Sequence, residues 1–376
     1  MFFGVGMKKT NLNYLLIFIS LSFFGCEEQL DKKTHINHGQ VSNLFSEYDV
    51  ALLAKSYHNN QNLFELVKKS RCPQNVFFSV KALNNKRGGN IHVAILKRNA
   101  ARAQAQAKMF VVANQHAREL IAGEIAARFI AETCAAWNAC DKGTCSKEQK
   151  YTYEATKDTN FVVVFNANPV GREAVTSGAA PCTRVNPVSG IDMNRNWAEG
   201  FIPGAQVLAE RTETYSGKHA FEDPNTAMIR DLFKQEKPDL FLDIHSGAFA
   251  LLTNFGFIKA VDPLVFATQK KLLDSIKQEE CPNCLLGSVA QELKYTGGGM
   301  ALDWARVKKG LVLSFLFEIY GWDANKKQGI GEFENKCLRY YNPPPDQFNS
   351  VVNQWLQALY KVARFVAEIP EKERHS

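Results

Sequence analysis

The sequence lacks a long apolar run, a block of like charge and an internal repeat. Its longest apolar stretch, from Tyr14 to Phe24, has about 11 residues, whereas a membrane-spanning helix needs about 20. The 45 basic and 38 acidic residues give a net charge of +7 that is spread along the chain, so the clustered basic patch of a nucleic-acid-binding protein is missing. With 45% hydrophobic and 22% charged residues, the composition is that of a globular protein. Disordered, fibrous and membrane-spanning proteins are thereby excluded.

The N-terminus has the pattern of an export signal. Lys8 and Lys9 precede the apolar run and the small residue Gly25 follows it, which predicts a cleavable signal peptide over residues 1–25. Cys26 comes next in a context that resembles a bacterial lipoprotein site, so the alternatives are a lipid anchor at Cys26 and plain secretion. Residues 26–46 are polar and predict a short tether. Both alternatives place the protein outside the cytoplasm.

Cysteine usage agrees with export. The chain has nine cysteines, at positions 26, 72, 134, 140, 145, 182, 281, 284 and 337. Without Cys26 an even number remains, enough for up to four disulfides whose connectivity cannot be deduced from the sequence. Cys281 and Cys284 have the spacing of half a zinc site, but no second Cys or His pair matches them, so we expect a disulfide there.

Short apolar runs alternate with helical patterns along the chain. Strands buried on both faces are predicted at Met109–Ala113, Phe161–Phe165, Leu240–Ile244 and Leu311–Phe317. Apolar residues recur at helical spacing over Glu119–Trp137, Pro224–Gln235, Pro263–Ile276 and Gln347–Val366. This alternation predicts an α/β fold with one domain, residues 47–369, and a mixed, mostly parallel, twisted sheet of about eight strands flanked by helices on both faces. We expect a surface insertion over residues 138–160 and a polar tail over residues 370–376.

Polar side chains follow the predicted strands, where α/β proteins place their sites. His116 and Glu119 are three residues apart at the predicted start of a helix, which puts both on one face and lets them grip one cation; the alternative is a surface ion pair. His245 follows the strand Leu240–Ile244 and is either a satisfied core histidine or a third ligand. Two histidines and a glutamate with one open position form a known catalytic zinc set.

Two further clusters carry charge. Arg195 can hold a carboxylate with two hydrogen bonds and Asn194 can add a third, with Arg184 and Asp192 close in sequence; the alternative is a polar loop with its arginines in solvent. Glu318 ends an otherwise apolar strand. A charge there is costly unless it is paired, which favours a functional role over a structural one.

Taken in order, these elements resemble the zinc metallocarboxypeptidases of the carboxypeptidase A-like family. That family shows an HxxE motif, an Arg followed by an Asn-Arg-Asn element, a His-Ser, a Tyr–Gly-rich–Asp-Trp segment and a Phe-Glu. All five occur here in that order between His116 and Glu318, and the resemblance covers roughly residues 47–367. It implies a hydrolase with one Zn²⁺ that removes the C-terminal residue of peptides or proteins with a free C-terminus. We expect a monomer.

The resemblance also implies a role for each matching residue. His116, Glu119 and His245 would be the zinc ligands, with Asp192 orienting the first histidine. Glu318 would act as the general base, and Arg184 as the cation that stabilises the oxyanion. Substrate-binding roles fall to Asn194 and Arg195 as the clamp for the C-terminal carboxylate, Tyr295 as the mobile residue that closes over it, and Arg118 as the arginine of a secondary subsite.

The resemblance also implies that the pocket for the C-terminal side chain lies beside Leu302, just before the Asp-Trp pair, and Gly256, in the loop after His245. Neither offers an acidic partner to a basic side chain, and Gly256 leaves room for a large ring, so we predict a preference for hydrophobic or aromatic C-terminal residues. Asp303 should face the protein rather than the substrate. Gly247 stands where digestive relatives carry a bulky aromatic residue, which puts the shape of a neighbouring subsite in doubt.

Two other functions fit the same fold. One is a relative that cleaves a different amide, such as a cell-wall peptide. The other is a catalytically inactive binding protein, which predicts the loss of a metal ligand or of the base. His116, Glu119, His245 and Glu318 are all present, which argues against inactivity.

Overall fold

The computed structural model describes residues 56–98, 106–204, 213–322 and 337–375, which all belong to the compact unit Phe45–Ser376. The predicted signal peptide, the tether and Cys26 lie outside the described residues. In chain order the elements are α2 (Asn60–Lys68), β1 (Val76–Asn84), β2 (Asn90–Arg98), β3 (Ala107–Ala113), α3 (Leu120–Asp141), α4 (Lys147–Thr156), β4 (Thr159–Asn166), α5 (Pro169–Thr176), the 3₁₀ turn η2 (Met193–Arg195), α6 (Pro224–Glu236), β5 (Leu240–Thr253), α7 (Pro263–Glu279), β6 (Leu285–Ser288), α8 (Val289–Glu292), α9 (Ala301–Lys309), β7 (Leu313–Trp322), α10 (Cys337–Tyr341), α11 (Pro345–Glu368) and η4 (Glu371–Glu373).

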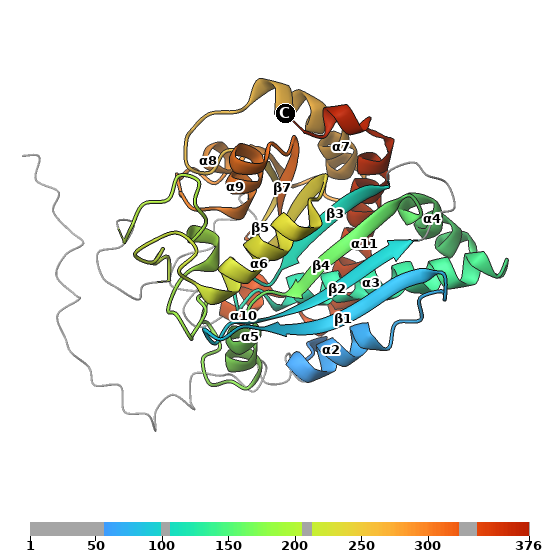
Figure 1. The fold of residues 1–376 in the computed structure, drawn as a ribbon, viewed down its shortest axis with the longest axis horizontal. Helices are drawn as coiled ribbons and strands as arrows, with labels where there is room; N and C mark the ends of the chain where they lie inside the picture. Colours follow the sequence, from blue (N-terminus) through green and yellow to red (C-terminus); the bar gives the residue numbers. More distant parts are fainter. Residues whose placement is uncertain (1–55, 99–105, 205–212, 323–336, 376) are drawn as a thin grey trace, which may run out of the picture. The chain divides into compact units, whose positions relative to one another are not determined.

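The strands form one mixed sheet in the order β1-β2-β4-β3-β5-β6, with β7 paired to β5 (Figure 1). β3 runs parallel to β4 and β5, and β5 runs parallel to β6 and β7. β1 and β2 are antiparallel at one edge. The predicted mixed, mostly parallel α/β sheet is confirmed, with seven strands in the described residues instead of about eight.

The central strands are buried on both faces because their side chains feed two separate cores. In β3, Met109 and Val111 belong to one apolar cluster, whereas Phe110 and Val112 belong to the other. Side chains of α3, α7 and α11 cover the first face, and those of α6 and α9 cover the second; Figure 1 shows α6 in front of the sheet and α11 behind it. Successive strand residues point to opposite faces, so an unbroken apolar run is the expected sequence of such a strand.

Side-chain caps fix where several helices begin. Asp223 accepts a hydrogen bond from Thr226 N and precedes a proline at the first position of α6, and Asp262 plays the same part for α7. The predicted insertion at residues 138–160 is instead the end of α3 and the whole of α4. Ser146 and Gln149 form a capping box at the start of α4, and Trp137 Nε1 donates to Thr156 Oγ1 (2.8 Å), which ties the two helices together.

The chain's remaining features concern its cross-links and its end. The eight cysteines from Cys72 onward form four disulfides, as expected: Cys72–Cys134, Cys140–Cys145, Cys182–Cys337 and Cys281–Cys284. The predicted polar tail packs on the domain as far as residue 375. Val312 N donates to Arg374 O (3.0 Å), and Leu311 and His375 form an isolated β-bridge. In the described parts of the chain, none of the helices combines the length and apolarity that crossing a bilayer requires.

Candidate active site

Three neighbouring parallel strands bring the predicted site together. Ala113 at the end of β3 lies opposite Ile244 of β5, and the next residue of β5, His245, lies opposite Glu318 of β7. β5 and β7 continue past His245 and Glu318 to Thr253 and Trp322, so these two residues lie within their strands and not at the strand ends where the sequence predicted them. Residues more than two hundred positions apart in sequence therefore face one another across two strands.

The His116–Glu119 pair lies in a turn rather than on the face of a helix, so that expectation was wrong. Glu119 is the residue before α3 and has non-helical dihedrals (φ −88°, ψ 59°). Asn114 Nδ2 donates to His116 O (2.8 Å), and Ala117 N donates to Arg184 O (3.0 Å). These bonds hold the turn so that His116 Nδ1 lies 2.7 Å from Glu119 Oε1.

The two histidines and the glutamate converge on one buried point. His245 Nδ1 lies 3.0 Å from both His116 Nδ1 and Glu119 Oε2, and the three possible ligand atoms all lie within 4.8 Å of one another. On the far side of each ring, Nε2 faces a carboxylate: Asp192 Oδ1 at 3.0 Å for His116 and Asp243 Oδ2 at 2.9 Å for His245. A proton on each Nε2 leaves the Nδ1 lone pairs free for a cation, which is the arrangement of carboxylate–histidine–zinc sites. This buried donor set fits zinc.

The charges around this point favour ionised carboxylates. Burial alone would raise the pKa of Glu119, but the charges and hydrogen bonds of His116 and His245 outweigh burial and lower it. Burial likewise opposes ionisation of Asp192, yet Arg184 and His116 hold its pKa well below the usual range. The pKa of His245 is raised because Asp243 and Glu119 outweigh its burial. The ionised carboxylates of Glu119 and Asp192 therefore lie where a cation would bind.

Glu318 pairs with His245 across β5 and β7 and so lies beside the two histidines and Glu119. Its Oε2 is buried and has no hydrogen-bond partner among the described residues. Burial and the negative charge of Glu119 raise the pKa of Glu318 to about 7, against the opposing charges of His245 and Arg184. A carboxyl group with such a pKa can exchange a proton near neutral pH.

Arg184 is fixed at the same site by its neighbours. Its Nε donates to Asp192 Oδ2 (2.8 Å), and its Nη1 lies 3.8 Å from Glu119 Oε1. The charges of Asp192 and Glu119 outweigh its burial and raise its pKa. The guanidinium therefore stays charged in a fixed position, as an oxyanion-stabilising group requires.

The predicted carboxylate clamp is only partly open to a ligand. Arg195 Nη2 donates to the Tyr295 hydroxyl (3.1 Å), and Tyr295 is 43% exposed. The Asn194 side chain is occupied: its Nδ2 donates to Asp243 Oδ2 (3.2 Å), and its Oδ1 accepts from Ala301 N (2.9 Å). The buried Arg195, which is 5% exposed, thus pairs with the exposed Tyr295. Asn194 lies between this pair and His245, because its backbone oxygen accepts from Arg195 Nη1 (2.7 Å) and its Nδ2 lies 3.1 Å from His245 Nε2.

Arg118 and Gly247 meet an aromatic ring from the far end of the chain. A side chain at Gly247 would place its Cβ 2.8 Å from Tyr341 Cε1 and 3.8 Å from Glu318 Oε2, so Tyr341 of α10 fills the space that the missing side chain leaves. The Arg118 guanidinium lies 4.4 Å from the centre of the same ring, and its Nη1 pairs with Glu213 Oε1 (2.7 Å).

The expected room beside Gly256 is not there. A Cβ at Gly256 would lie 2.4 Å from Met300 Sδ, so the Met300 side chain occupies this space. Leu302 is buried in the same apolar cluster as Met300. Asp303 faces the protein, as predicted: its Oδ2 accepts from Gly256 N (2.9 Å) and Phe257 N (3.3 Å).

Sequence reasoning missed three contributors. Asp243 orients His245 and is itself held by Gln115 Nε2 (2.7 Å); a carboxylate inside a buried strand, two residues before a histidine, is the signal that could have found it. Met300 is a bulky residue in a glycine-rich segment, which is a weaker signal. Tyr341 lies far from every motif, and no local pattern marks it.

Comparisons with known proteins agree with this geometry. Residues 80–358 match the zinc carboxypeptidase family. Carboxypeptidase A1 of Bos taurus is 26% identical over 190 residues, covering 46% of this chain and 45% of its own length. A zinc carboxypeptidase of Simulium vittatum is 24% identical over 227 residues, covering 57% of this chain and 71% of its own. The matched part of the chain thus spans less than half of the bovine relative.

A solved structure gives the same fold. Carboxypeptidase A from Helicoverpa armigera superposes with a TM-score of 0.66 at 17% identity, covering 85% of this chain and 80% of that one. The family match extends over most of the chain and contains the converging histidines and glutamate, the glutamate on β7 and the arginine cluster. The protein therefore belongs to the zinc carboxypeptidase family.

Proposed function

We propose that this protein is a zinc-dependent exopeptidase that hydrolyses the C-terminal peptide bond of peptides or proteins. The observation that carries the proposal is the buried donor set of His116, Glu119 and His245 with Glu318 Oε2 beside it, unpartnered among the described residues. A structural zinc site closes four positions with protein ligands. Here three protein ligands adjoin a carboxylate that is suited to move a proton.

The roles of the chain's own groups follow from their positions. A zinc ion bound by the three ligands would supply a Lewis acid that acidifies water and polarises a carbonyl group. Glu318 accepts the proton of the attacking water and delivers it to the departing amine, for which a pKa near 7 is suited. Arg184 stabilises the negative charge that develops on the carbonyl oxygen. Arg195 holds the free α-carboxylate with Tyr295 next to it.

The side-chain pocket supports a preference for hydrophobic C-terminal residues. Leu302 and Met300 are buried in an apolar cluster, and Asp303 is occupied by the backbone of residues 256 and 257. No acidic group of the described residues is thus offered to a basic side chain at this place, and a buried cation without a partner is costly. The four disulfides support a location outside the cytoplasm, because disulfides persist in oxidising compartments.

The decisive experiment combines metal analysis with a peptide screen. Purified protein should contain one zinc per chain and shorten peptides by one residue, and a chelator should abolish both until zinc is added back. His245→Ala should lose the metal, whereas His219→Ala, at an exposed histidine, should keep it. Internal cleavage, or full zinc content in His245→Ala, would contradict the proposal.

A further inference from the structure

The space between Gly256 and Gly297 is filled by one side chain, that of Met300. A Cβ at Gly256 would lie 2.4 Å from Met300 Sδ and 3.2 Å from its Cε, and a Cβ at Gly297 would lie 2.9 Å from the same Cε. The two segments are joined directly, since Gly297 N donates to Gly256 O (2.9 Å). The thioether of Met300 therefore lies between two glycines, Gly256 and Gly297, which have no side chains to compete for this space.

Met300 lies next to the groups that would hold the substrate's C-terminus. The Cβ position of Gly297, which is 2.9 Å from Met300 Cε, is also 3.2 Å from Arg195 Nε and 3.2 Å from Tyr295 Cε2. A peptide whose carboxylate binds Arg195 has its last side chain only one carbon away from that carboxylate. Met300 is therefore within reach of that side chain.

The backbone that carries Met300 has little freedom to move away. The preceding residue, Gly299, has φ +71°, and a Cβ there would lie 2.0 Å from Arg195 O, so only glycine fits this contact. On the other side, Ala301 N donates to Asn194 Oδ1 (2.9 Å), and Met300 itself is 1% exposed. Any enlargement of the pocket must come from rotation of the Met300 side chain, because its backbone is held from both ends.

We infer that Met300 is a specificity-determining residue that limits the C-terminal side chain to small aliphatic groups and disfavours aromatic ones. The inference rests on the proposed carboxypeptidase function and sets a size limit on its hydrophobic preference. Cores are packed at close to crystal density, so a ring can enter only if the thioether leaves. Methionine has three rotatable bonds and repacks more easily than a branched residue, which makes the limit graded rather than absolute.

The test uses matched peptides that differ only in the last residue: Ala, Val, Leu, Phe or Arg. The wild-type protein should release Ala and Val with higher kcat/KM than Phe. Met300→Ala and Met300→Gly should raise kcat/KM for Phe relative to Ala by about 10–100-fold, since each methylene of misfit in such a pocket is worth about 10-fold or more. Met228→Ala is the matched control, because Met228 packs against the same apolar cluster from α6 and should leave the ratio unchanged.

The outcomes separate the inference from the proposed function. If the zinc-loaded wild type shortens no peptide, the proposed function fails. If it shortens peptides but releases Phe faster than Ala, or if the Met300 variants keep the wild-type ratio, the function stands and the size limit is overturned. Met300→Leu, which keeps the volume, covers the case in which the smaller variants do not fold: it should retain the preference for small residues, and a gain for Phe in this variant would also overturn the inference.

Discussion

The disulfide between Cys182 and Cys337 is predicted to support both the stability of the fold and the order of the active site. Cys182 lies two residues before Arg184, and Cys337 begins α10. α10 carries Tyr341, which packs against Gly247 beside the base. Replacement of both cysteines by serine leaves the loop and α10 connected only by weaker contacts.

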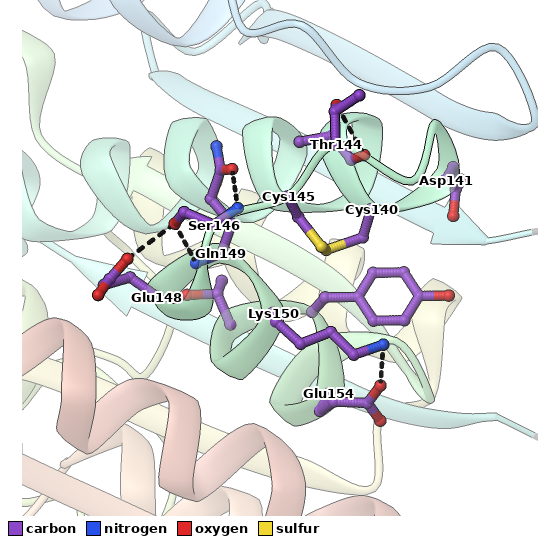
Figure 2. The surroundings of a disulfide bond; sticks show 12 residues. Cys140, Asp141, Thr144, Cys145, Ser146, Glu148, Gln149, Lys150 and Glu154 are labelled. Atoms are coloured by element: carbon purple, nitrogen blue, oxygen red, sulfur yellow. Dashed lines mark hydrogen bonds and ion pairs between the residues drawn. A yellow bond between two sulfur atoms is a disulfide. The ribbon is translucent and has the colours of Figure 1, made fainter.

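The size of the stability effect follows from the length of chain that each disulfide closes. Cys182–Cys337 has a sequence separation of 155, for which the loop-entropy relation gives a stabilisation of about 5 kcal/mol. Cys140–Cys145 has a separation of 5, for which the same relation gives about 2 kcal/mol. The second disulfide lies where α3 ends and α4 begins, next to the capping box of Ser146 (Figure 2), and is the matched control.

The activity effect should separate the two disulfides more sharply. α10 remains attached through Asn342, which accepts from Ile121 N (3.0 Å) and donates to Arg118 O (2.8 Å), so we expect the fold to persist. A misplacement of Arg184 by about 1 Å can cost about 100-fold in rate. The double serine variant at positions 182 and 337 should therefore lose kcat/KM, and the variant at positions 140 and 145 should keep it.

Urea denaturation and peptide hydrolysis measure the two effects on the same preparations. Equal losses of unfolding free energy in the two double variants would refute the loop-length argument. Full kcat/KM in the Cys182→Ser/Cys337→Ser variant, at a temperature where it is folded, would show that the disulfide does not order the site.

Three further predictions test single residues. Glu318→Gln should keep its zinc and its fold but lose about 10²–10⁴-fold in turnover. In the wild type, kcat/KM should fall as the pH drops through the pKa of Glu318, because the protonated carboxyl cannot accept a proton; near-normal turnover in the variant would place the base elsewhere. Arg195→Ala should lose about 10–100-fold on peptides with a free C-terminus, since hydrogen bonds to a charged group are worth about 1.5–3 kcal/mol, and an equal loss on amidated peptides would count against a clamp. Burial raises the pKa of Asp303 from 3.8 to about 6, against hydrogen bonds from Asn254 and two backbone amides. Protonated Asp303 therefore contributes about 3 kcal/mol to the free energy of unfolding below about pH 4, and this contribution is lost as the pH rises through 6. Asp303→Asn should remove that slope from the unfolding free energy measured between pH 4 and 8, and an unchanged slope would refute the assignment.

The sequence alone was enough to predict the strands β3, β4, β5 and β7 and a candidate site beside them, whereas β1, β2 and β6 were not predicted. Runs such as Met109–Ala113 are apolar at every position because both faces of the strand are buried, and such a run gives an unambiguous signal. Edge strands give a weaker signal. β1 is half exposed along much of its length, so its sequence pattern cannot be distinguished from that of a loop. The helix of residues 147–156 was missed because it is polar and packs through only a few side chains.

The candidate metal ligands could be predicted because histidine and glutamate are residue types that bind zinc. A histidine and a glutamate three residues apart, together with a histidine that follows a buried apolar run, suggest a cation site. Only the parallel pairing of β3, β5 and β7 decides that His116, His245 and Glu318 meet at one edge. The turn that holds Glu119 outside α3 is in part a tertiary effect, because Ala117 N donates to Arg184 O and Ser246 N donates to Glu119 Oε2.

Residue type and local patterns were enough to predict a candidate metal site, up to four disulfides and an α/β sheet, since these properties depend on short patterns of polarity and on the presence of particular side chains. The shape of the predicted substrate pocket, by contrast, depends on tertiary packing. The sequence predicted open space at Gly256 and left the shape beside Gly247 undecided, yet Met300 fills the first place and Tyr341 the second. A glycine in the sequence indicates only that this position has no side chain. Which neighbour fills the gap depends on contacts between segments that no local pattern connects, and close packing ensures that some neighbour does.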